Sequence, residues 1–173
     1  MSVPRKGLII SLFSLIALLA GCGQTQEERV EEGLADARAA FEQEPVDTNE
    51  TVNGTDLYLP GAYTIEEPSD ANNIVITRGS DSYVLFLNPN ESNDSTFFYE
   101  LQKANDDQEW VADETFEQNG RFGFATVREI AEDRYEIVAS EGGAKMTTIS
   151  EESGIADNMD WMMTTVRSID SEE

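Results

Sequence analysis

The stretch NIVITRGSDSYVLFLN, from Asn73 to Asn88, contains two apolar runs joined by a short polar segment. Both runs are rich in β-branched and aromatic residues, which favour the extended backbone of a β-strand. The segment between them, Gly79-Ser80-Asp81, has the composition of a tight turn. Two such runs around a short glycine-containing turn predict a β-hairpin over 73–78 and 82–87.

Short apolar runs bounded by turn signals lie on both sides of this hairpin. Two precede it and four follow it, and the segments QNG at 118–120 and EGG at 141–143 carry the glycines that tight hairpin turns require. The additional strands are expected at 57–59, 63–66, 109–116, 121–130, 134–140 and 144–149. Consecutive hairpins of this kind predict an antiparallel sheet.

Two helices are predicted around the later strands. Ser95 is a favourable N-cap for the first, and we expect Phe97, Phe98, Leu101 and Ala104 of that helix to face inward. The second follows the dipeptide at 153–154, where apolar side chains recur on one face. These are Ile155, Met159, Met162, Val166 and Ile169. A methionine stripe suits either an adaptable binding surface or a core, and we expect a core.

An earlier helix is predicted over about 27–41. Val30, Leu34, Ala37 and Phe41 recur there at steps of four, three and four, which places them on one stripe. Packing on the following domain, packing on a partner and a half-exposed position near a membrane are the three options, and we expect core packing. The segment 43–54 has turn-forming residues and no periodicity, which predicts a linker.

Together these elements predict an α+β domain over 55–173. Its twisted antiparallel sheet has about six to eight strands, a central and a C-terminal helix pack on it, and a separate N-terminal helix precedes it within an acidic tether over 22–54. The order of elements over about 55–172 is similar to the PsbP-like fold and to small bacterial lipoproteins with domains of that shape. This resemblance implies a fold and no site residues. A lipocalin-like barrel, with more strand and less helix, is the alternative.

The first 22 residues have the layout of an export signal. Two basic residues are followed by a 13-residue apolar run from Leu8 to Ala20, which is shorter than the roughly 20 residues that span a bilayer. The run ends in Leu19-Ala20-Gly21-Cys22, and Cys22 is the only cysteine of the chain. A lone cysteine in an exported protein calls for an explanation, and the alternative to a dedicated role is a chance thiol.

The tetrapeptide Leu19-Ala20-Gly21-Cys22 resembles the lipobox of bacterial lipoproteins. The resemblance implies cleavage between Gly21 and Cys22, transfer of diacylglycerol to the Cys22 sulfur, and anchoring of the mature chain at the outer face of the cell membrane. Two acyl chains on one residue are sufficient for stable anchoring. The expected partner is therefore the membrane, through the lipid on Cys22, and we favour a Gram-positive cell.

Composition excludes several classes of partner. The mature chain after this cleavage carries nine basic and 35 acidic side chains, a net charge of −26. Such a surface repels nucleic-acid phosphates and anionic headgroups, so we expect no nucleic-acid binding. The acidity is typical of a solvated surface that must stay soluble, and adaptation to saline or alkaline surroundings is a further hypothesis.

Several chemistries lack the residues that they need. The chain has no histidine, which removes histidine-based triads and the usual zinc and iron sites, and a lipidated Cys22 leaves no thiol for catalysis. The loop over 88–94 is rich in oxygen ligands but lacks the register of a calcium loop, so a turn is the better interpretation. We therefore predict no catalytic, metal-binding or cofactor-binding residues and no cofactor.

These observations predict a membrane-anchored, exported and non-catalytic accessory or protein-interaction module. A small-ligand or cation-binding domain is the alternative, and a hydrolase that uses a pair of carboxylates is the third. A hydrophobic groove between the last helix and the sheet would favour a ligand, whereas a filled core with an exposed apolar patch would favour a protein partner. Buried, convergent carboxyl groups with raised pKa values would favour the enzyme.

Overall fold

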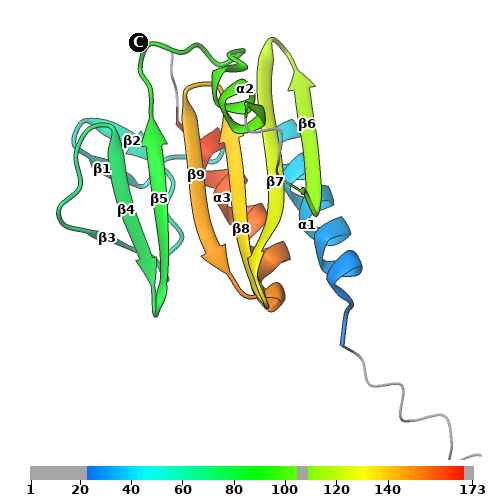
Figure 1. Ribbon diagram of the computed structural model, residues 1–173. Helices are drawn as coiled ribbons and strands as arrows, with labels where there is room; N and C mark the ends of the chain where they lie inside the picture. The colour runs from blue at the N-terminus through cyan, green and yellow to red at the C-terminus, as the bar shows by residue number, and fades with distance from the viewer. Residues whose placement is uncertain (1–22, 105–108, 170–173) are drawn as a thin grey trace, which may run out of the picture.

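The computed structural model describes residues 23–104 and 109–169 (Figure 1). Seven strands form one antiparallel sheet in the order β3-β4-β5-β9-β8-β7-β6. Their bounds are β3 Thr64–Glu66, β4 Asn73–Arg78, β5 Asp81–Leu87, β6 Ala112–Gln118, β7 Arg121–Ala131, β8 Arg134–Glu141 and β9 Ala144–Ser150. The sheet has two outer strands, β3 and β6, which do not pair with each other, so it is an open sheet and the lipocalin-like alternative is wrong.

The three α-helices lie on opposite faces of this sheet. Figure 1 shows α1 (Gln26–Glu42) and α3 (Ile155–Arg167) on one face and the short α2 (Phe97–Lys103) on the other. A 3₁₀ turn (Glu152–Gly154) leads into α3. The predicted α+β class is confirmed: an antiparallel sheet of seven strands carries an N-terminal, a central and a C-terminal helix.

The main core lies between the sheet and the pair α1 and α3. Alternate residues of each inner strand face these helices, because successive side chains of a strand point to opposite faces. The face is apolar, and its fully buried members include Ile76, Leu85, Ile137, Met146 and Val127. The predicted stripe of α3 packs against them, with Ile155, Met159, Met162, Val166 and Ile169 all buried. The methionine stripe is therefore part of the core.

Helix α1 precedes the strands of the sheet in the sequence but packs with them in the folded chain. A reciprocal capping box starts it, in which the Thr25 hydroxyl accepts a hydrogen bond from the Glu28 amide and the Glu28 carboxylate accepts one from the Thr25 amide. The helix packs on α3 so closely at Gly33 that a Cβ there would lie 2.7 Å from Met159 Sδ. The stripe that we expected in the core is buried at Val30, Ala37 and Phe41.

Several details differ from the sequence-based expectations. Helix α2 is capped at Thr96 and not at Ser95, and the strands expected at 57–59 and 109–116 lie at Thr55–Leu57 and Ala112–Gln118. The predicted linker contains β1 (Glu50–Val52), which forms a two-stranded ribbon with β2 (Thr55–Leu57). The Asn49 side chain stabilises this ribbon, since it accepts a hydrogen bond from the Leu59 amide at 2.8 Å and donates one to the Leu59 carbonyl at 2.9 Å. Helix α2 buries Phe98 alone of its expected inward residues; its other three, at 97, 101 and 104, are exposed. This helix has only seven residues and packs on the sheet with one side. Nothing described covers its outer side, which is why its other apolar residues stay exposed.

Buried polar groups tie α3 to the elements around it. Asn158 Oδ1 accepts hydrogen bonds from the Tyr83 hydroxyl at 2.9 Å and from Trp161 Nε1 at 3.2 Å. The Arg167 guanidinium donates to the carbonyl of Phe41 at the end of α1 and lies 3.5 Å from the buried carboxylate of Glu141. Paired groups of this kind remove the penalty of burying polar atoms and fix the position of the helix.

Candidate functional site

The face of the sheet opposite α1 and α3 is uncovered over β5 and β9. Their register places Val84 beside Thr147 and Phe86 beside Lys145, with Ile149 two residues further along β9. These five residues, which we call the open face, alternate with the buried residues of the main core. Val84 is 43% exposed and Ile149 is 45% exposed, which is unusual for large apolar side chains in the middle of a sheet.

Helix α2 covers the neighbouring part of the same face. Phe98 packs there with Phe122, Phe124 and Val138 in a second, smaller apolar cluster. This cluster ends at the open face, where the rings of Phe98 and Phe86 meet edge to face with centroids 5.6 Å apart. The sheet is therefore covered by a helix over β7 and β8 and left bare over β5 and β9.

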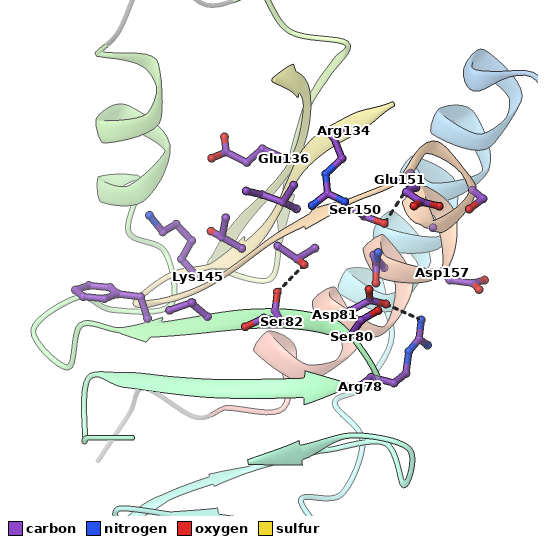
Figure 2. Close-up of a pocket in the computed structure, with 18 residues that line it drawn as sticks. Arg78, Ser80, Asp81, Ser82, Arg134, Glu136, Lys145, Ser150, Glu151 and Asp157 are labelled. Carbon is purple, nitrogen blue, oxygen red and sulfur yellow. Dashed lines mark hydrogen bonds and ion pairs between the residues drawn. The ribbon is translucent and has the colours of Figure 1, made fainter. Parts of the chain in front are cut away.

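A shallow pocket of about 980 Å³ lies over the open face and reaches the start of α3 (Figure 2). Figure 2 shows Lys145 at one end of the pocket, and Arg78, Glu151 and Asp157 at the other end. Arg78 is paired with Asp81, with 3.9 Å between nitrogen and oxygen. The floor of the pocket is mixed, because polar residues lie beside Val84, Phe86 and Ile149, and Arg134 and Glu136 of β8 also line it.

Lys145 is the charged member of the open face. Its ammonium lies 5.2 Å from the centroid of the Phe98 ring, in a cation–π contact. Burial lowers the pKa of Lys145, and the negative charge of Glu136 opposes that shift. The Glu136 carboxylate is itself bound by Arg128 at 2.8 Å. Among the described residues Lys145 takes part in no ion pair.

Among the described residues, the interface between α3 and the sheet is filled by packed side chains. The side chains between α3 and the sheet are almost wholly buried, with Met159, Met162 and Met163 fully so. The aromatic rings of Tyr63, Tyr83 and Trp161 close the end of that interface, with ring centroids 4.0 to 5.6 Å apart. The core is filled, and the exposed apolar patch lies on the other face.

The carboxyl group with a raised pKa lies away from the pocket. Partial desolvation of the Asp160 carboxyl raises its pKa although the residue is exposed on α3, and the charges of Asp36 on α1 and Asp157 on α3 add to the effect. Asp160 does not line the pocket over the open face. Within the described ranges, no group of three or more Asp or Glu side chains is arranged to hold a metal ion.

The oxygen-rich loop at 88–94 serves as a structured turn. The Asn88 side chain accepts a hydrogen bond from the backbone amide of Asn90 at 3.2 Å. The Asn93 carbonyl accepts one from the backbone of Phe122, and the Asn88 amide donates one to Gly143. The loop therefore packs on the β8–β9 hairpin, whose turn contains the Gly-Gly pair that we interpreted as a hairpin connection.

The residues of the predicted lipid site, Leu19, Ala20, Gly21 and Cys22, lie outside the described residues. No motif in the sequence singles out Lys145, and its place on the open face comes from the pairing of β5 with β9. The signal that identifies it is the alternation of β9, in which positions 145, 147 and 149 share one face. Their position beside β5 is known only from the folded structure, because the two strands are about sixty residues apart in the sequence.

Comparison with protein-family models and with curated protein sequences gave no match. None of the helices within residues 23–104 and 109–169 is both long and apolar enough to cross a bilayer. The function is therefore inferred from the geometry of the described chain and from the sequence of its first 22 residues.

Proposed function

We propose that this protein is an exported lipoprotein, anchored at the outer face of the cell membrane through Cys22, that acts as a non-catalytic protein-interaction module. The observation that carries the interaction role is the open face, where Val84 and Ile149 remain more than 40% exposed beside a filled core. Apolar side chains gathered on one rigid surface are the usual basis of a protein interface.

The alternatives lack comparable support. A small-ligand role depended on a groove between the last helix and the sheet, and that interface is filled by α3 side chains. A carboxylate hydrolase needs convergent carboxyl groups with raised pKa values, and Asp160 lies outside the pocket over the open face. Non-catalytic contact through the open face is the role that fits the described residues best.

Site-specific photo-crosslinking in native membranes tests the interaction role. A photoreactive residue in place of Val84 or Ile149 should give a discrete crosslinked species with another protein. Val46 is the matched control, because it is also an exposed valine, 41% accessible, but lies outside the sheet. Equal crosslinking from position 46, or no species from positions 84 and 149, would overturn the role of the open face.

The anchor is tested separately. Cys22→Ala should abolish incorporation of a labelled fatty acid and release the chain from the membrane fraction, because the thioether attachment is lost. Ser2→Ala changes the signal region without touching the cysteine and should leave both readouts unchanged. Tight membrane fractionation of the Cys22→Ala chain would contradict the lipid anchor.

A further inference from the structure

Helix α1 is held in the folded domain from its first turn to its last. Val30, Ala37 and Phe41 are buried in the main core, so the helix cannot swing away from the sheet without exposing them to water. Near its start the Arg29 guanidinium lies 3.6 Å from the Glu152 carboxylate of the 3₁₀ turn. The position of the start of α1 therefore fixes the position of the whole domain.

The chain that precedes the helix is short and partly fixed. The Gln24 side chain donates a hydrogen bond to the Glu32 carboxylate at 2.6 Å, and Thr25 is the capping residue of α1. Gly23 is thus the single residue between Cys22 and the part of the chain that is bound to the helix. Three residue steps from Cys22 to Thr25 span at most about 11 Å, even with a fully extended backbone.

The start of α1 lies at one end of the sheet. Figure 1 shows the β7–β8 turn and the start of α3 at the same end. The Asp133 carboxylate in that turn accepts a hydrogen bond from the Glu152 amide at 3.0 Å, and the Glu152 carboxylate is the partner of Arg29. We call this end, defined by Arg29, Glu132, Asp133 and Glu152, the anchor end.

Charge does not attract the anchor end to a bilayer. Exposed carboxylates outnumber the basic residues Arg29 and Arg134 in the first turns of α1 and in the β7–β8 turn. These carboxylates belong to Glu27, Glu28, Glu31, Glu132 and Asp133. Anionic headgroups repel such a surface, and zwitterionic headgroups have no net charge to attract it. A position at the bilayer must therefore come from the short link to Cys22.

We infer that the anchor end lies at the outer headgroup layer of the bilayer and that the domain stands on it. The link of about 11 Å and the four helical residues from Thr25 to Arg29, at 1.5 Å each, keep Arg29 within about 17 Å of the lipid-bearing residue. This limit holds whichever way the backbone bends at Gly23. The inference rests on the proposed anchor at Cys22 and adds the membrane surface that the folded domain faces.

The open face begins near the anchor end. The pocket over it reaches Glu151 and Ser153, which flank Glu152, and extends along β9 to Lys145. Five residue steps from Lys145 to Ser150 correspond to about 17 Å of strand. The open face is therefore presented within a few tens of ångströms of the headgroups, and the proposed protein partner must reach it in that layer.

Energy transfer from single labelled positions to acceptor headgroups tests this placement. The lipidated full chain is reconstituted in phosphatidylcholine vesicles, with a thiol-reactive donor attached at Glu132→Cys or, in a second chain, at Glu117→Cys. Cys22 carries the lipid, so the introduced cysteine is the thiol that reacts. Position 117 is the matched control: both glutamates are exposed, but the register of β6 and β7 places them at opposite ends of the sheet, about 30 Å apart. Transfer from position 132 should be at least about twofold more efficient than transfer from position 117.

A longer link provides the second measurement. About 20 Gly and Ser residues inserted between Gly23 and Gln24 leave the capping box intact and add a flexible segment with an end-to-end distance of about 25 Å. Transfer from position 132 should then fall toward the value at position 117. Urea unfolding of each labelled chain confirms that it is folded.

The possible results separate this inference from the anchor on which it rests. Equal transfer from positions 117 and 132 in a chain that has incorporated labelled fatty acid would overturn the placement and leave the anchor standing. Transfer from position 132 that does not respond to the longer link would do the same. A chain that incorporates no fatty acid would overturn both.

Discussion

At the scale of single residues, Gly123 shows how tightly the core constrains the sequence. It lies on β7, on the face that carries α1 and α3, directly under the ring of Phe41. A Cβ at this position would lie 2.8 Å from Phe41 Cε2 and 2.8 Å from the Ser140 carbonyl oxygen. The glycine therefore allows α1 to approach the sheet, and no turn or positive φ is involved.

Gly123→Ala should destabilise the protein by about 1–3 kcal/mol, because the added methyl group overpacks a filled core and one of its neighbours is backbone. The free energy of unfolding in urea measures the effect. Gly61→Ala is the matched control, since a Cβ there meets nothing within 4 Å. A Gly123→Ala variant as stable as the control would show that Phe41 moves aside without cost.

At the scale of elements, the contact between α1 and α3 combines close packing with like charges. Gly33 and Met159 bring the two helices together, and the negative charge of Asp36 on α1 acts on Asp160 of α3. Burial is the main cause of the raised pKa of Asp160, and the negative charges of Asp36 and Asp157 reinforce it. The ionised form of Asp160 therefore opposes the packing that the apolar stripes favour.

Asp160→Asn should raise the free energy of unfolding at pH 7. The folded-state pKa of Asp160 is raised above its unfolded value. The protonated carboxyl therefore stabilises the folded state fully below about pH 4, and this stabilisation is lost as the pH rises through the folded-state pKa. The variant and the wild type should therefore differ at pH 7 and agree at pH 3. Glu44→Gln, at an exposed position after α1, controls for the loss of one charge. Equal stability of the wild type and Asp160→Asn at pH 7 would contradict the account.

At the scale of the whole molecule, the excess of carboxylates is the dominant electrostatic feature. The sequence has 35 acidic and 11 basic residues, and the eight ion pairs among the described residues use several of the basic ones. The remaining negative charges repel one another across the folded surface. Salt screens such repulsion, with a Debye length of about 10 Å at 0.1 M and about 3 Å at 1 M.

The melting temperature should therefore rise between 0.05 and 1 M sodium chloride, by roughly several degrees if screening recovers about 1 kcal/mol in a chain of this size. A variant with four exposed carboxylates converted to amides, at Glu31, Glu44, Asp47 and Glu117, has less repulsion and should show a smaller rise. Calorimetry of both chains measures the difference. An identical salt response would show that general salt effects, and not self-repulsion, act on the stability.

The local elements of the fold could be predicted because their signals are local. Glycine-containing turns join β4 to β5, β6 to β7 and β8 to β9, and strand pairing is expected from such hairpins. The stripes of α1 and α3 recur at helical spacing, and both are buried as expected. The inward face of α2 was predicted too broadly, because the surrounding strands limit its apolar contacts to Phe98 and Tyr99.

The candidate site could not be predicted in the same way. The open face needs β5 beside β9, and the pairing of strands this far apart depends on which apolar faces the whole chain can bury together. The exposure of Val84 and Ile149 also depends on where α2 packs, since a helix over β5 and β9 would hide them. Neither fact is encoded in a short segment.

The acidic charge, the lack of histidine, the α+β class and the predicted lipid site at Cys22 all follow from residue identity or local periodicity. Only the packed chain shows that β1 forms within the expected linker and that Lys145 lies beside Phe86 on an uncovered part of the sheet. The physical reason is that burial is a property of the whole packed chain, so the side of each element that stays exposed is known only when every other element is in place.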